Sequence, residues 1–255
     1  SGDRMDSAAV YLALPEPDRA QHLWRYTPWH RIHPTGKHAD LPESTGPPTL
    51  TLSLLDGEAT PEGVTLTSAT PEDLAELCST PHDDVASTLI RALSEGEAVV
   101  LRVDRTTILD QPLLLDVNAE GEVCSLHLLL DIGSMAEIEL VTSMSGNAGW
   151  FGLLREGRVR AGAHLNDVVV NRLGSTHMLR VDGIQVERDA QVRAGVVGVG
   201  AKRAKADLRY ELAGPGASIW VDGSLTSMGK QHNDHHIEIL HEARETFSRL
   251  AWHSA

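Results

Sequence analysis

Hydrophobic and polar residues alternate along most of the chain beyond residue 96. Ala206, Leu208, Tyr210 and Leu212 occupy every second position of one stretch, and charged residues fill the positions between them. A period of two predicts a β-strand with one buried face. Glycines punctuate the joints between many short stretches of this kind. The predicted strands are EAVVLRV, QPLLLDV, SLHLLLDI, AEIELVTSM, NDVVVNRL, HMLRVDGI, KADLRYELAG and ASIWVDGSL.

These predicted strands also recur at an interval of 40 residues. Val141, Val181 and Val221 are spaced 40 apart (181 − 141 and 221 − 181), and the last two each open a Val-Asp-Gly tripeptide. This period fits two coils of about 20 residues each in a stacked solenoid, where each coil covers its neighbour's apolar face. Three repeats do not close a propeller ring, and a sandwich would alternate without a shared frame. We therefore predict a mostly β fold with a β-helix core over residues 96–255.

The first third of the chain predicts helices and loops instead. Residues 1–10 are interpreted as a tag remnant or disordered N-terminus, and residues 11–95 as a helical region with a linker. Within it, a helix is expected in residues 14–32, where Pro28 stops it. Residues 33–48 are rich in Pro, Gly and Ser, which is typical of a linker.

Two further helices are predicted from their start signals. Residues 70–79 begin with Thr70 as N-cap and Pro71 at the first helical position, followed by acidic residues in the first turn. Residues 80–96 begin with the same Thr-Pro pair, carry an apolar stripe at helical spacing and end at Gly96.

Composition excludes several classes of protein. The formal net charge is −14 at pH 7, whereas binding to nucleic acid needs clustered Lys and Arg. No apolar stretch approaches the roughly 20 residues of a membrane helix, and the N-terminus lacks the features of a secretory signal. Only two cysteines occur, so no disulfide framework is implied. We expect a soluble, cytoplasmic protein with neither nucleic acid nor membrane as a partner.

The two cysteines are interpreted as unreactive. Cys78 lies between the two predicted helix starts, and we expect a small buried apolar residue there and not a reactive thiol. Cys124 lies in a predicted strand with no evident activating base beyond His127. The chain also lacks a G-x-S-x-G nucleophile motif, so no catalytic residue is assigned.

A histidine-rich segment near the end of the chain admits two interpretations. His232, His235 and His241, with Asp234, are candidate ligands of a transition metal such as Fe or Zn, because imidazole and carboxylate suit these ions. Alternatively, residues 229–234 form a polar corner and a strand follows, with hydrogen-bonded histidines. The segment has no H-E-x-x-H spacing, and adjacent residues on a strand point to opposite faces.

Three segments resemble the SufB/SufD family of iron–sulfur cluster assembly proteins, and SufD more than SufB. The stretch LWRYTPW (23–29) is similar to a Trp-Arg-Tyr-Thr signature of SufD-type chains, and residues 88–115 resemble the segment that leads onto the family's core. The strongest match, residues 208–248, is similar to the family run of Leu-x-Gly-x-Gly-Ala, Gln-His-x-Asp-His-His and Thr-x-Ser. The matching residues are Leu212, Gly214, Gly216, Ala217, Gly223, Gln231, His232, Asp234, His235, His236, His241, Thr246 and Ser248.

This resemblance implies a right-handed parallel β-helix that serves as a scaffold and not as an enzyme. In the family, SufB and SufD pair through their β-helices, and each docks a SufC ATPase on a C-terminal helical domain. The resemblance therefore implies SufC, and a SufB-type subunit or a second copy of the chain, as partners. It also implies a transient iron–sulfur cluster at the interface, no stably bound cofactor in this chain, and flavin as a ligand of the complex.

The chain departs from the family pattern in two respects. It ends at RLAWHSA (249–255), where family members continue with more β-helix and the SufC-docking domain, so we interpret the end as a truncation and transfer no cluster ligand. Cys124 does not match the sulfur-accepting cysteine of SufB, which favours a SufD-like role or a homologue serving both roles. An open last coil should make the chain self-associate.

The alternative function is a β-helical metal-dependent or carbohydrate-active enzyme that uses residues 232–241. Paired carboxylates such as Asp207 with Glu211, or Asp222 with Asp234, are the side chains that would carry acid–base chemistry in it.

Overall fold

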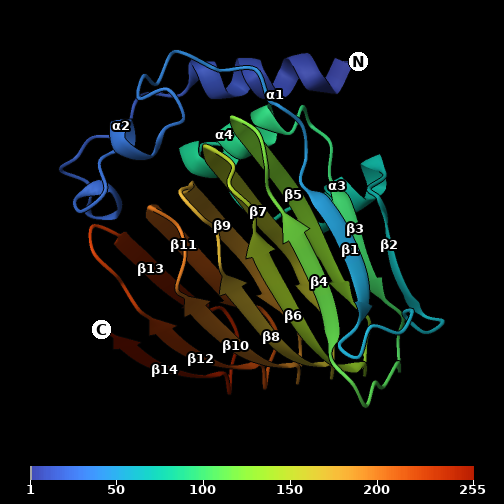
Figure 1. The fold of residues 1–255 in the computed structure, drawn as a ribbon. Helices are drawn as coiled ribbons and strands as arrows, with labels where there is room; N and C mark the ends of the chain where they lie inside the picture. The colour runs from blue at the N-terminus through green and yellow to red at the C-terminus, as the bar shows by residue number, and fades with distance from the viewer. Residues whose placement is uncertain (1) are drawn as a thin grey trace.

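Two seven-stranded sheets stack face to face in this computed structural model, which describes residues 2–255, with side chains from residue 7 (Figure 1). Sheet A has the strand order β13-β11-β9-β7-β5-β3-β2, and sheet B the order β1-β4-β6-β8-β10-β12-β14. The strands are β1 Thr49–Leu54, β2 Val64–Ser68, β3 Val99–Val103, β4 Leu113–Asn118, β5 Val123–Ile132, β6 Glu137–Ser145, β7 Trp150–Val159, β8 His164–Asn171, β9 His177–Val186, β10 Gln191–Gly198, β11 Arg203–Leu212, β12 Ser218–Leu225, β13 His232–His241 and β14 Phe247–Ser254.

From β3 onward the chain alternates between the sheets, and neighbouring strands within each sheet run parallel. This arrangement is a β-solenoid, and it confirms the predicted mostly β, β-helical core. All eight strands named from the sequence are present. Beyond residue 96 the pattern missed β7, β10 and β14.

The predicted repeat of 40 residues is wrong, because one coil contains about 27 residues. Val168 pairs with Gly195, and Gly195 with Asp222, so residues one coil apart differ by 27 in number (195 − 168 and 222 − 195). Forty residues is therefore about one and a half coils. Positions 141 and 221 accordingly lie in sheet B, and position 181 lies in sheet A. The false period arose because both sheets carry the same aliphatic alternation.

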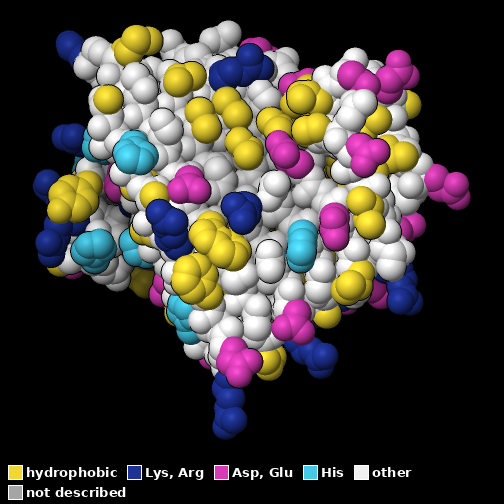
Figure 2. Space-filling view, turned by 90° about the horizontal axis from the view of Figure 1, so that it is seen from below, with side chains coloured by type: hydrophobic (Ala, Val, Ile, Leu, Met, Phe, Trp, Pro, Cys, Tyr) yellow, Lys and Arg dark blue, Asp and Glu magenta, His cyan; other side chains and the backbone are white. Residues whose placement is uncertain are grey.

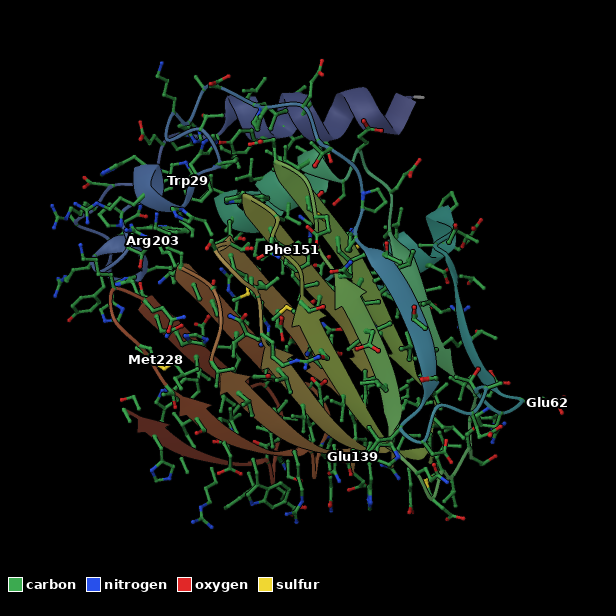
Figure 3. All side chains as sticks on the ribbon, viewed as in Figure 1. Trp29, Glu62, Glu139, Phe151, Arg203 and Met228 are labelled. Atoms are coloured by element: carbon green, nitrogen blue, oxygen red, sulfur yellow. The ribbon has the colours of Figure 1, made fainter. Side chains whose placement is uncertain are left out.

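The main core fills the space between the two sheets. Its aliphatic side chains come from alternate positions of successive strands, and Phe151 lies among them (Figure 3). Leu208 and Tyr210 are buried there, as their alternation predicted. The polar positions of the same strand are not exposed, however: Lys205 and Asp207 are also buried. The outer face of sheet A is thus covered, and the predicted half-buried strand is buried on both sides.

The N-terminal elements cover sheet A (Figure 1). They are α1 Gly2–Ala13, the short 3-10 helix η1 His22–Trp24, α2 Trp29–Ile32, α3 Pro71–Leu77 and α4 Val85–Leu93. Tyr11, Trp24 and Trp29 form a second core with Leu154 and Val181 of the sheet. This burial of large rings, and not local helix propensity, holds the segment in place.

Two predictions for this region are corrected. Position 1 lies outside the described residues, but positions 2–10, interpreted as a tag remnant or a disordered N-terminus, belong to α1 and are therefore not disordered; Tyr11 of this helix is fully buried. The helix expected in 14–32 is reduced to η1 and α2, because prolines interrupt the segment and its aromatic side chains pack on the sheet.

The region 11–95 is not purely helical either. β1 and β2 lie within it and pair antiparallel with β4 and β3, so each extends one sheet at the N-terminal end of the solenoid. The alternating sequence of β1, TLTLSL, already carries the signal of a strand. Between α2 and β1 the predicted linker, 33–48, contains no helix or extended strand.

The two predicted helix starts have different outcomes. Thr70 caps α3 as expected: its side chain accepts a hydrogen bond from the Asp73 amide, and Pro71 opens the helix. Thr80 does not cap α4. That helix begins at Asp84, whose carboxylate accepts a hydrogen bond from the Ser87 amide. Thr80 is instead used in a tertiary contact.

Candidate metal-binding site and the histidine segment

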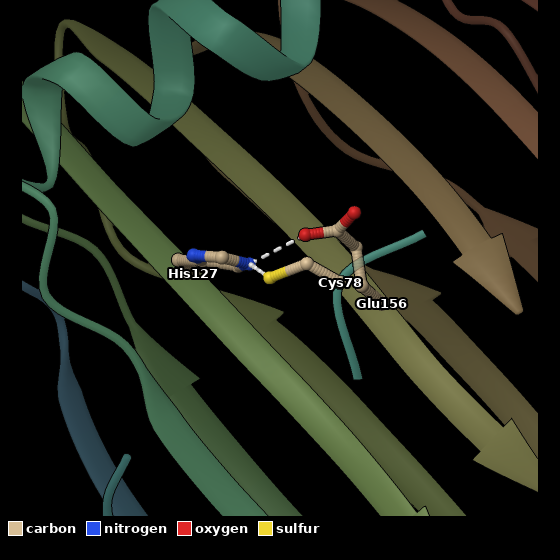
Figure 4. Close-up of side chains that lie close together, drawn as sticks. All are labelled: Cys78, His127 and Glu156. Carbon is tan, nitrogen blue, oxygen red and sulfur yellow. Dashed lines mark hydrogen bonds and ion pairs between the residues drawn. The ribbon is translucent and has the colours of Figure 1, made fainter. Parts of the chain in front are cut away.

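Three side chains with metal-binding atoms meet where the loop between α3 and α4 lies on sheet A (Figure 4). Cys78 is the C-cap residue of α3. His127 comes from β5 and Glu156 from β7, which pairs with β5 so that Leu129 lies opposite Glu156. All three ligand atoms lie within 4.8 Å of one another, and no other such cluster occurs in the described part of the chain.

His127 is the central member of this cluster. Its Nε2 lies 2.7 Å from Glu156 Oε2 and 3.9 Å from Cys78 Sγ. The same nitrogen therefore faces both the carboxylate and the thiol. In a Cys-His catalytic pair the imidazole uses one nitrogen for the thiol and the other for the orienting group. Here a single nitrogen faces both groups, so the three donor atoms surround one point. They do not form the chain of hydrogen bonds that a catalytic pair requires.

Glu156 is held firmly from the side of the α3–α4 loop. Its Oε1 accepts hydrogen bonds from the backbone amides of Ser79 (3.0 Å) and Thr80 (2.7 Å) and from the Thr80 hydroxyl (2.6 Å). Arg91 of α4 donates to the same oxygen at 2.9 Å. Thr80 thus fails to cap α4 because its amide and hydroxyl both bind this carboxylate. Oε2 remains directed toward His127.

The electrostatics of the cluster favour an ionised carboxylate and a protonated thiol. Burial acts to raise the pKa of Glu156, but the hydrogen bond and charge of His127, with Arg91 and Thr80, hold it below its ordinary value. Burial, with the nearby charge of Glu156, raises the pKa of Cys78 to about 12. This raised pKa disfavours the thiolate form of the isolated side chain. Cys78 is half-buried, and it lies against an apolar cluster as well as against His127, whereas the sequence led us to expect a buried apolar residue.

A cleft lies beside this cluster. It has a volume of about 490 Å³, and its lining includes His127, Ser125, Leu74 and the turn that follows α4. His127 is one of the lining residues although it is only 2% exposed, and neither Cys78 nor Glu156 lines the cleft.

Cys124 is separate from this site. It is fully buried in the core between the sheets, where burial raises its pKa to about 11. Residues three apart on a strand face opposite sides, so His127 points away from it. The base that the sequence offered to Cys124 approaches Cys78 instead.

The three predicted metal ligands His232, His235 and His241 all lie on β13 but make separate contacts. His232 Nε2 lies 2.9 Å from the Thr27 hydroxyl. His241 Nδ1 and Nε2 lie 2.7 and 3.0 Å from the hydroxyls of Thr246 and Ser248. The three histidines do not form a cluster of the kind found at Cys78. The expected corner at 229–234 is also shorter, since β13 already begins at His232.

His235 differs from the other two histidines. Its ring packs against Trp252 at 5.5 Å, and its Nδ1 is buried with no hydrogen-bond partner in the described part of the chain. Burial, assisted by the charges of Arg180 and Lys205, lowers the pKa of His235 to about 4. The imidazole is therefore neutral at ordinary pH.

Two of the carboxylates considered for an enzyme, Asp234 and Asp207, make other contacts. Asp234 accepts hydrogen bonds from Lys205 and Thr27, and Asp207 is bound by Arg209 and His236. Asp222 is in sheet B whereas Asp234 is in sheet A, so this pair does not share a face.

A buried ion cluster lies between the sheets. Arg155 of β7, which is fully buried, binds Asp167 of β8 through two nitrogens at 3.0 and 2.5 Å. It also binds Asp182 of β9 at 2.9 Å, and Arg180 supports Asp182 at 2.7 Å. Two arginines and two aspartates give this cluster no net charge.

Sequence reasoning did not assign His127 and Glu156 to a common site. Part of the signal was present, since His127 interrupts an apolar run and Glu156 follows it by 29 residues, close to one coil. The false period of 40 concealed that relation. Cys78 reaches the site from another part of the chain, and no local pattern indicates this approach.

Comparison with known proteins agrees with the solenoid. Residues 115–255 match the family model described as the SufBD core domain of SUF system FeS cluster assembly. This match covers more than half of the chain, so the chain belongs to the SufBD core family and has a role in SUF iron–sulfur cluster assembly. That family comprises assembly proteins and is not a known class of enzymes. A search of curated proteins finds no match. Within residues 2–255, no helix combines the length and the apolar character needed to cross a membrane.

Proposed function

We propose that the chain is a scaffold subunit of the SUF assembly complex, closer to SufD than to SufB. The observation that carries this proposal is the family match over β4–β14, the part of the chain that forms the stacked coils. A solenoid of this kind offers extended flat surfaces for other subunits. In this role the chain holds no iron–sulfur cluster or flavin by itself, and works in the cytoplasm without catalysing a reaction.

One surface suited to a partner is the last coil. Leu250 of β14 pairs with the core residue Val221 and faces the same side of the sheet, yet its side chain is 53% exposed. Ile237, Ile239 and Trp252 likewise extend the main core but are only partly buried. No described strand lies beyond β13 and β14. A further coil, a second copy or a SufB-type subunit would cover these apolar side chains.

The outer face of the molecule seen from below is a second such surface. Hydrophobic side chains are interspersed there with acidic, basic and histidine side chains, and no single charge dominates (Figure 2). A mixed composition of this kind is compatible with binding another protein, because a non-obligate interface is about as apolar as the rest of a protein surface, and it is unsuited to nucleic acid.

Gel filtration with purified SufC and a SufB-type protein tests this proposal. We expect co-elution at micromolar concentration, and self-association of the chain alone. The change Leu250→Glu should abolish association, because it places a charge within the apolar end of the core. Leu55→Glu is the matched control, since Leu55 is 54% exposed in the turn after β1. Independent elution of all the proteins, or equal effects of the two substitutions, would contradict the proposal.

Metal analysis distinguishes the enzyme alternative from the scaffold proposal. Stoichiometric metal that His235→Ala and His241→Ala both abolish would support a metal-dependent enzyme at residues 232–241. Retention of fold and partner binding in both variants supports the scaffold.

A further inference from the structure

We propose that Cys78, His127 and Glu156 bind one divalent transition-metal ion, Zn²⁺ or Fe²⁺, that joins the α3–α4 loop to sheet A. This site lies outside the histidine segment and goes beyond the scaffold role. It also revises the expectation that the chain holds no cofactor of its own.

The positions of the donor atoms are close to those of a tetrahedral site. With Zn–S and Zn–N bonds of about 2.3 and 2.0 Å, tetrahedral ligand atoms are about 3.3 to 3.6 Å apart. The observed separations are 3.9 Å from Cys78 Sγ to His127 Nε2 and 2.7 Å from His127 Nε2 to Glu156 Oε2. These two separations differ from the tetrahedral values by about 0.5 Å, and the third, between Cys78 and Glu156, is below 4.8 Å.

The surroundings of Glu156 orient it as a ligand. Four hydrogen bonds to Oε1, from Ser79, Thr80 and Arg91, fix the carboxylate plane and leave Oε2 directed at the cluster. In known metal sites, groups that do not bind the ion themselves commonly hydrogen-bond to a ligand and so hold it in position.

Charge and donor type select the class of metal. A thiolate, an imidazole and a carboxylate together favour Zn²⁺ or Fe²⁺ over Mg²⁺ and Ca²⁺, which prefer oxygen ligands alone. Binding releases the thiol proton of Cys78. With Glu156 and Arg91 already balancing each other, the ion and the thiolate leave one positive charge. A fourth ligand, such as water or a small anion, would have to enter from the cleft that His127 lines, because Glu156 is fully buried.

Metal titration of the purified, reduced chain tests the site. Zn²⁺ binding is measured by calorimetry, Fe²⁺ binding under anaerobic conditions, and Co²⁺ is used as a spectroscopic probe of thiolate ligation. We expect one equivalent to bind, with a thiolate-to-cobalt charge-transfer band. Cys78→Ser should weaken binding at least about 100-fold and remove the band. Cys124→Ala, which removes the other cysteine, should change neither.

Two further variants locate the ion. Glu156→Gln should weaken binding while circular dichroism reports whether the fold is kept, and Cys78→Ser provides the same test if Glu156→Gln does not fold. The double change His235→Ala/His241→Ala should leave binding intact.

The site is refuted if folded Cys78→Ser protein binds as tightly as the unmodified chain, if no equivalent binds at all, or if binding is lost with His235 and His241. Because no partner protein is used, such a result would leave the scaffold proposal standing.

Discussion

Replacing Arg155 by methionine tests whether the buried ion cluster holds the two sheets of the solenoid together. Methionine keeps the length and most of the volume of the arginine but removes its charge and its donors. Arg155 is fully buried and is shared by strands of both sheets: it binds Asp167 of sheet B and Asp182 of sheet A.

The expected loss of stability depends on which hydrogen bonds each aspartate keeps when Arg155 is replaced. Asp182 retains two hydrogen bonds from Arg180. Within the described part of the chain, both hydrogen bonds to Asp167 come from Arg155, so its buried carboxylate loses them together. Removing one partner of a buried ion pair costs about 3 to 5 kcal/mol, a large share of the typical 5 to 15 kcal/mol of a domain. We expect Arg155→Met to lower the free energy of unfolding by about 3 to 5 kcal/mol.

Urea unfolding followed by circular dichroism measures this loss. The double variant Arg155→Met/Asp167→Asn should recover about 2 kcal/mol relative to the single variant, because a neutral amide is less costly to bury than a carboxylate. Arg188→Met is the control. Because Arg188 and Asp189 are largely exposed, loss of this ion pair should lower the free energy of unfolding by less than about 0.5 kcal/mol. Additive effects of the Arg155 and Asp167 substitutions would refute the reasoning.

Three further predictions concern single positions. Gly157→Ala should destabilise by about 3 kcal/mol or more, measured by urea unfolding, because a Cβ there would lie 1.9 Å from the Leu130 carbonyl oxygen at a φ of +151°. The lowered pKa of His235, about 4, means that its contribution to stability is present above the unfolded pKa of 6.5 and is lost as pH falls from 6.5 toward 4. Between pH 7.5 and 5, His235→Phe should therefore lose about 1 to 2 kcal/mol less than the unmodified chain, and equal losses would contradict this. Thr70→Ala should cost about 1 kcal/mol through the lost cap of α3, seen as a lower thermal midpoint, and an unchanged midpoint would show that the cap is dispensable.

Several features of the fold follow from local sequence because their causes are local. The alternation at 206–212 specifies a strand wherever the chain has a core to cover. The cap at Thr70 requires only the neighbouring amide and Pro71. The Pro- and Gly-rich stretch 33–48 lacks regular structure for reasons contained in its own backbone. The cap and the loop are decided by interactions between neighbouring residues, whereas the strand also needs the core that its apolar face covers.

Predictions failed where distant segments compete for the same groups. Thr80 has the same sequence context as Thr70, yet Glu156 takes both its amide and its hydroxyl, so α4 begins at Asp84. The segment around Trp24 does not form the expected long helix, because its aromatic side chains pack on sheet A. In each case the energy of a long-range contact exceeds the small preference of the local pattern.

By itself, the sequence determined the elements of this protein: a series of aliphatic strands, a capped helix and the family resemblance that the core domain confirmed. Only the tertiary structure decided the length of the coil, the separation of the histidines on β13 and the meeting of Cys78 with His127 and Glu156. The physical reason is that alternation records which side of a strand is buried, but not which strand lies above it. That register depends on corner lengths and side-chain packing summed over a whole coil, and it determines which polar groups meet.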